Sequence, residues 1–150
     1  MNIKRLKKNS QGVSFTELIL IVAIIAILSA ATVPLGINFL RKGYLKNTRD
    51  VLVSYLNSAH ILSIGPKNGT GWGVYVTPSD ITLFSGTSYA TRDTAFDSEY
   101  EIPAGVNIDP SEVTFTKYTG KTSQTSIYME GADGSSYTIS VNANGDISYE

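Results

Sequence analysis

Uncharged residues run without interruption from Leu18 to Ile37, and this stretch is the strongest hydropathy feature of the chain. As a helix, its 20 residues would span about 30 Å, which is the thickness of the hydrocarbon core of a bilayer. Glu17 stands at its N-terminal border, and four basic residues precede it: Lys4, Arg5, Lys7 and Lys8. The pattern predicts a membrane-spanning helix whose basic leader stays in the cytoplasm.

Apolar residues continue beyond this stretch with helical spacing. They recur at Leu40, Tyr44, Leu52, Tyr55, Ala59 and Leu62, with Thr48 in register. Gly65 and Pro66 then supply a helix end. We therefore expect one helix from near Val13 to Ile64, apolar on all sides in its first half and on one side in its second. Pro34 is expected to kink it.

Short β-rich segments separated by turn residues fill the rest of the chain. We expect strands at Trp72–Thr77, Ile81–Ser85, Val113–Tyr118, Ser126–Glu130, Tyr137–Val141 and Asp146–Tyr149. Residues 86–112 are polar and irregular, which predicts a long loop with one short strand near Ile102. Asn144-Gly145 is a strong hairpin signal. Because a meander with one apolar face needs a cover, the predicted class is α+β, with the long helix packed against a small antiparallel sheet.

Glu17 is the residue that this arrangement explains least easily. A carboxylate inside a membrane-spanning segment costs about 2.5–3.5 kcal/mol by insertion scales, so such a residue indicates a function. It needs a positive partner. The nearest one available would be an amino terminus produced by cleavage close to Gly12.

The motif Gly12-Val13-Ser14-Phe15-Thr16-Glu17 resembles the cleavage site of type IV pilins and type II secretion pseudopilins. The resemblance implies the type IV pilin fold and cleavage after Gly12 by a prepilin peptidase. It also implies N-methylation of Val13, Glu17 at the fifth mature position and a kinking Pro34 at the twenty-second. One departure is Val13, because the family usually begins with Phe. The hairpin at residues 137–145 is similar to that of H-type minor pseudopilins and favours a minor subunit.

This resemblance implies a structural subunit of a type IV pilus-like or pseudopilus filament, assembled through its apolar helix and Glu17. Residues 1–12 would be a cleaved leader and 13–38 the transmembrane and filament-core half of the helix. Residues 39–150 would form the exported head, made of helix 39–64 and a β-meander at 70–150. The subunit would cross the bacterial inner membrane once, head outside, before joining an extracellular or periplasmic filament. Expected partners are the prepilin peptidase, other subunits, an assembly platform with its ATPase, and membrane lipid before assembly.

Two other interpretations fit the same N-terminal region. The basic segment, the apolar core and Ser29-Ala30-Ala31 would suit a secretory signal cleaved after Ala31. The chain could also be an uncleaved single-span anchor. In either case it would be a binding protein that does not polymerise and uses residues 86–112 and its aromatic face to hold a ligand.

Charge and composition argue against several other functions. Residues 65–150 carry four basic and eleven acidic residues, a balance of about −7, so binding to nucleic acid is not expected. With a single histidine, His60, and no cysteine, we expect no enzyme, no metal site and no cofactor. Three questions stay open: which filament system is served, whether Asn68 is glycosylated, and whether the acids of the 86–112 loop hold a cation. Those acids are Asp93, Asp97, Glu99 and Glu101.

Overall fold

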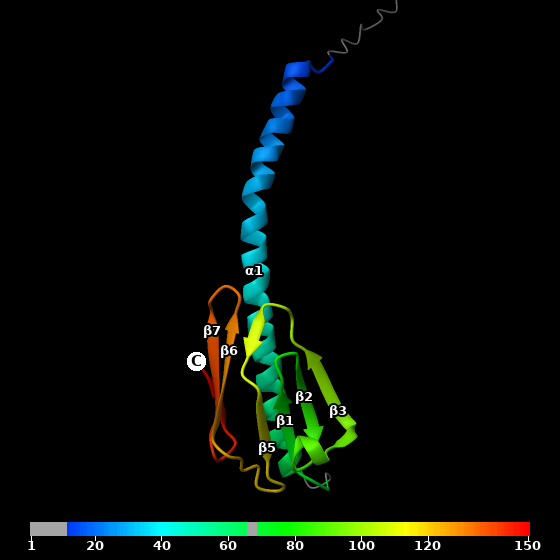
Figure 1. Cartoon of the computed structure of the whole chain (residues 1–150), viewed down its shortest axis with the longest axis vertical. Coiled ribbons are helices and arrows are strands. Elements are labelled where there is room, and N and C mark those ends of the chain that lie inside the picture. The colour runs from blue at the N-terminus through cyan, green and yellow to red at the C-terminus, as the bar shows by residue number, and fades with distance from the viewer. Residues whose placement is uncertain (1–11, 66–68) are drawn as a thin grey trace, which may run out of the picture. The chain divides into compact units, whose positions relative to one another are not determined.

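The computed structural model describes residues 12–65 and 69–150, and within helix α1 it describes no side chains at residues 30–42. The chain divides into two compact units, Met1–Ile37 and Asn38–Glu150. Helix α1 (Phe15–Ile64) contributes residues to both (Figure 1). The predicted leader, residues 1–12, lies outside the described residues except for Gly12, and so does Asn68.

Two antiparallel four-stranded sheets make up most of the second unit. Sheet A has the order β3-β2-β1-β5 and sheet B the order β4-β6-β7-β8. The short helix η1 (Tyr89–Thr91) lies between β2 and β3. The strands are β1 (Trp72–Val76), β2 (Asp80–Ser85), β3 (Asp93–Glu101), β4 (Val106–Ile108), β5 (Ser111–Phe115), β6 (Thr125–Gly131), β7 (Ser136–Val141) and β8 (Ile147–Tyr149).

The core of the second unit joins one face of α1 to both sheets (Figure 1). Leu52, Leu56 and Ala59 on the helix are completely buried. They belong to one apolar cluster with Val74 and Val113 of sheet A and with residues of sheet B such as Ile127, Met129, Ile139 and Val141. Burial of these side chains is the main stabilising term, because each large apolar side chain removed from water contributes about 1.5–3 kcal/mol.

The predicted fold class is wrong in two respects. Across the residues described with their side chains, no helix is long and apolar enough to span a membrane. This finding covers residues 15–29 and 43–64 of α1, because the side chains of residues 30–42 are not described. The strands form two sheets and not one meander, and in the second unit, Asn38–Glu150, they contain more residues than helix α1 does.

The same finding corrects the predicted localisation and the membrane terms used with it. A single pass through the inner membrane required a spanning first half of the helix, and none is found among the residues described with their side chains. The prediction of Leu18–Ile37 as one membrane-spanning segment rests on hydropathy alone. The side chains of Pro34 and of the rest of 30–42 lie outside the described residues, so the kink at Pro34 stays a prediction.

The local strand predictions are largely confirmed, whereas the long loop is wrong. Each of the six expected strands is present, displaced at its ends by at most three residues. Residues 86–112, however, contain η1, β3 and β4. Strand β3 pairs with β2 alone at the edge of sheet A, and most of its residues on both faces are exposed. Its sequence therefore lacks the apolar alternation that identifies a half-buried strand.

The predicted helical stripe is confirmed at Thr48, Leu52 and Ala59, which are completely buried, but it missed the neighbouring positions Leu45 and Leu56. Leu45, Leu52 and Leu56 are buried, but Tyr44 is 43% exposed. Tyr55 and Leu62 are only partly buried against the core, and Leu40 lies among the helix residues whose side chains are not described. The neighbouring pairs Tyr44-Leu45 and Tyr55-Leu56 each offer two apolar residues, so periodicity alone could not choose between them.

Candidate functional site

The expected cleavage site lies immediately before helix α1. Gly12, Val13 and Ser14 are not helical and are exposed. The carbonyl of Ser14 accepts the first helical hydrogen bond, from the amide of Leu18 at 3.1 Å. A methyl group added at Gly12 would meet no atom within 4 Å. The Gly12–Val13 bond is thus accessible in an exposed, non-helical segment, which is where proteolysis concentrates.

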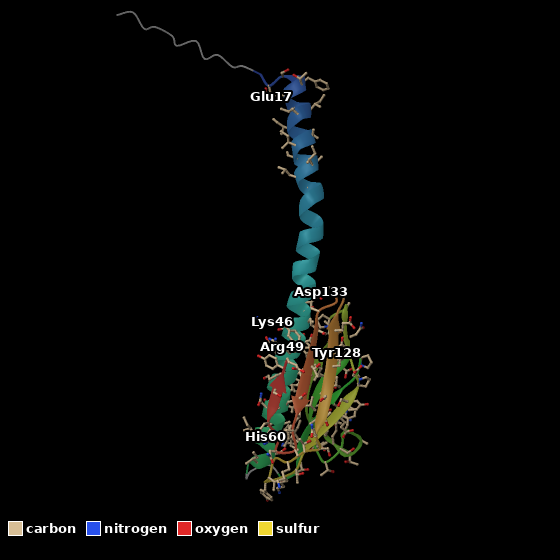
Figure 2. All side chains as sticks on the ribbon, turned by 90° about the vertical axis from the view of Figure 1, so that its left-hand side faces the viewer. Glu17, Lys46, Arg49, His60, Tyr128 and Asp133 are labelled. Atoms are coloured by element: carbon tan, nitrogen blue, oxygen red, sulfur yellow. The ribbon has the colours of Figure 1, made fainter. Side chains whose placement is uncertain are left out.

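Glu17 lies in the first turn of α1 (Figure 2). There its negative charge is favourable, because the helix dipole places partial positive charge at the N-terminus. Ser14 and Glu17 also have the spacing of a capping box, a signal that the sequence analysis missed. Among the described residues Glu17 has no ion-pair partner. The carboxylate therefore has a local structural role and is also available to a cation from outside the described chain.

Apolar side chains surround the N-terminal segment of α1 on all sides. Every large apolar side chain from Val13 to Leu28 is exposed by at least 47%, the value of Ile21, and Phe15 reaches 77%. Figure 2 shows side chains extending from this segment around the helix axis below Glu17. A contiguous apolar surface of this kind marks an interaction site, because monomeric proteins rarely leave one uncovered.

His60 is a packing residue of the second unit. Its ring is half-buried, with its centroid 5.3 Å from that of Phe115. A Cβ added at Gly120 or at Gly145 would lie only 2.4 or 2.7 Å from His60 Nε2, and both glycines have positive φ. The histidine thus fills the space beneath two turns that only glycine can form at this distance.

No group of three or more His, Cys, Asp or Glu side chains in the described part of the chain is placed to hold a metal ion. The acids named as a possible cation site lie along β3, exposed in part, and do not converge on one point. Asp97 instead accepts a hydrogen bond from Arg92 Nε at 2.7 Å. That carboxylate raises the pKa of the Arg92 guanidinium, chiefly through the hydrogen bond.

Arg49 forms a contact that sequence reasoning did not find. It is 8% exposed, and its guanidinium lies 4.5 Å from the ring centroid of Tyr137 and 4.6 Å from that of Tyr149. Burial acts to lower the pKa of Arg49, but the hydrogen bonds to Asp50 and its charge outweigh burial and raise the pKa. Such cation–π contacts stabilise by about 0.5–2 kcal/mol each, so Arg49 fastens the C-terminal strand β8 to the helix. No pattern in the sequence identifies these three residues as neighbours.

Comparison with protein-family models, with curated proteins and with solved structures finds no match for this chain. The pilin, pilus and secretion-system terms suggested by residues 12–17 consequently receive no support from known proteins, and the geometry of the described residues must carry the functional argument.

Proposed function

We propose that this chain is a structural subunit that polymerises into a filament through the N-terminal segment of α1, after cleavage behind Gly12 and methylation of Val13. The observation that carries this proposal is the ring of exposed apolar side chains from Val13 to Leu28. At about 25 cal/mol per Å², covering such a surface is strongly favourable, and equivalent segments of other copies are suitable covers.

The carboxylate of Glu17 indicates which ion pair would form within that assembly. Packing apolar helices around it removes the carboxylate from water, which is tolerable only if a positive charge neutralises it. The free chain has no ion pair for Glu17 among its described residues. Cleavage after Gly12 creates an amine at Val13, four residues away in the sequence, in the same subunit or in a neighbour. The chain would thus carry both halves of the pair that its assembled state requires.

Cysteine protection tests this proposal, since the chain has no cysteine of its own. Leu20→Cys should react quickly with a maleimide in detergent-dispersed subunits and at least about tenfold more slowly in sheared filaments, because packing excludes the reagent. Ser126→Cys, exposed on β6, is the control and should react equally in both samples. Equal labelling of Leu20→Cys in the two samples would contradict the proposal.

A further inference from the structure

We propose, resting on the function proposed above, that the heads of successive subunits also contact one another head to tail. The segment Thr116–Lys121 after β5, here called the basic tip, would dock into an acidic hollow on sheet A of a second copy. Each element of this contact lies in the second unit, Asn38–Glu150, and none belongs to the apolar segment of α1.

The acidic hollow lies beside the β2–β3 edge of sheet A. Its volume is about 520 Å³, and it is lined by Ser79, Asp80, Tyr89, Glu99 and Glu101. Asp80 and Glu101 are directly paired across the two strands, an arrangement in which like charges repel. Among the described residues none of the three carboxylates has an ion-pair partner. A cation entering the hollow would relieve this repulsion.

A buried hydroxyl on the same face of sheet A also lacks a partner. Thr82 is 1% exposed, and its Oγ1 makes no hydrogen bond to any described residue. Thr82 pairs with Tyr75 on one side and Glu99 on the other, so the three side chains share one face of the sheet. Tyr89, which lines the hollow, stacks on Tyr75, and the centroids of the two rings are 4.0 Å apart. The hydroxyl therefore lies on the same face of sheet A as the carboxylates of the hollow, without itself lining the hollow.

The basic tip carries positive charge and an exposed aromatic ring, which complement the acidic hollow. Tyr118 is held at a φ of 67°, which is unusual for a non-glycine residue, and its ring is 63% exposed. Its amide donates to the carbonyl of Ser63 at 2.9 Å, which fixes the turn to the end of α1. Lys117 Nζ lies 4.4 Å from the centre of the Tyr118 ring and donates to the carbonyl of Gly69. Lys121 is exposed, and its ammonium has no partner within the described chain.

The two surfaces lie at opposite ends of sheet A. Trp72 pairs with Phe115, next to the basic tip, whereas Val76 pairs with Ile81, next to the acidic hollow. The four steps along β1 separate these ends by about 13 Å, so one chain cannot bring them together. Different surfaces that recognise each other between identical chains make a heterologous contact, and such contacts extend into rings or open filaments. This is the contact geometry that a polymerising subunit requires.

Cross-linking between two differently tagged chains tests the contact. We expect the full-length variants Lys121→Cys and Glu101→Cys, produced together and oxidised, to yield a disulfide-linked heterodimer that contains both tags. Lys121→Cys with Ser126→Cys is the matched control, because Ser126 is equally exposed but lies on sheet B. A heterodimer at the level of the control would overturn the proposal.

Charge exchange provides the second arm. Lys121→Glu and Glu101→Lys alone should each lower filament yield about fivefold, the effect of losing roughly 1 kcal/mol at a repeated contact. The double variant should recover most of that yield. If both single variants assemble normally, the head-to-tail contact is wrong even though filaments form. If the unaltered chain forms no filaments, the proposed function fails instead.

Discussion

Replacement of Gly12 by Ala or Leu is expected to abolish processing and leave a precursor that keeps its four basic N-terminal residues. A peptidase that cuts next to Gly12 must accommodate a residue with almost no side chain before the scissile bond. The chain itself has room for a larger residue, because a Cβ at Gly12 meets no atom within 4 Å. The loss would therefore reflect the peptidase and not misfolding. Intact mass of the purified chain distinguishes precursor from product.

Gly43→Ala is the matched control for this substitution. Gly43 lies inside α1, where an added Cβ also meets nothing within 4 Å. Alanine favours a helix by about 1 kcal/mol over glycine, so this variant should be processed fully and be slightly more stable. Normal processing of Gly12→Leu would count against the cleavage that the motif implies.

Glu17→Val is expected to leave cleavage intact and to suppress assembly. Valine cannot pair with the amine of Val13, so that amine would be buried without a partner in the filament core. Removing one member of a buried ion pair costs about 3–5 kcal/mol, which corresponds to a loss of more than a hundredfold in an association constant. The measurement is the ratio of sheared filaments to total extracted subunit. If the chain is a minor subunit, filament number replaces bulk yield.

The first-turn position of Glu17 calls for a control that separates helix stability from charge pairing. Glu17→Asp keeps the negative charge that the helix N-terminus favours, whereas Glu17→Gln removes it and keeps the size. We expect Glu17→Asp to retain part of the assembly and Glu17→Gln to lose it as Glu17→Val does. Full assembly of Glu17→Gln would mean that the carboxylate stabilises the N-terminus of the helix and is not needed for an ion pair in the filament.

Local signals account for the parts of the fold that sequence reasoning predicted well. The Asn144-Gly145 turn lies where the chain reverses between β7 and β8, and Gly145 has a φ of 90°. Alternation placed Ile139 and Val141 on one buried face, as observed. These predictions depend on residues close in sequence, whose side chains report directly whether a strand has a buried side.

The assignment of strands to sheets depends on contacts distant in sequence and was not predictable in this way. Strand β4 joins sheet B, although β3 before it and β5 after it belong to sheet A. Three residues with the burial pattern of Val106, Asn107 and Ile108 fit either sheet equally well. The contact of Arg49 with Tyr137 and Tyr149 likewise forms only after the helix and the sheet have packed.

The candidate site shows the same division between motif and environment. Residue spacing singled out Gly12, Val13 and Glu17; the structure places Gly12 and Val13 just before α1 and Glu17 in its first turn, all three exposed. Spacing could not show that the neighbouring apolar side chains lack any cover in the single chain. Nor could it show that no helix among the residues described with their side chains is long and apolar enough to span a membrane. Uniform hydropathy indicates that a segment avoids water. It does not indicate which surface covers the segment.

The mass of the mature chain, measured intact from the organism that produces it, tests the account most directly. Cleavage after Gly12 and methylation of Val13 predict a mass that lacks residues 1–12 and is increased by the addition of one methyl group. This product keeps the whole apolar segment on which the proposed assembly depends. Loss of residues 1–31 would contradict the account, because cleavage after Ala31 removes both Glu17 and the exposed apolar side chains that the filament requires.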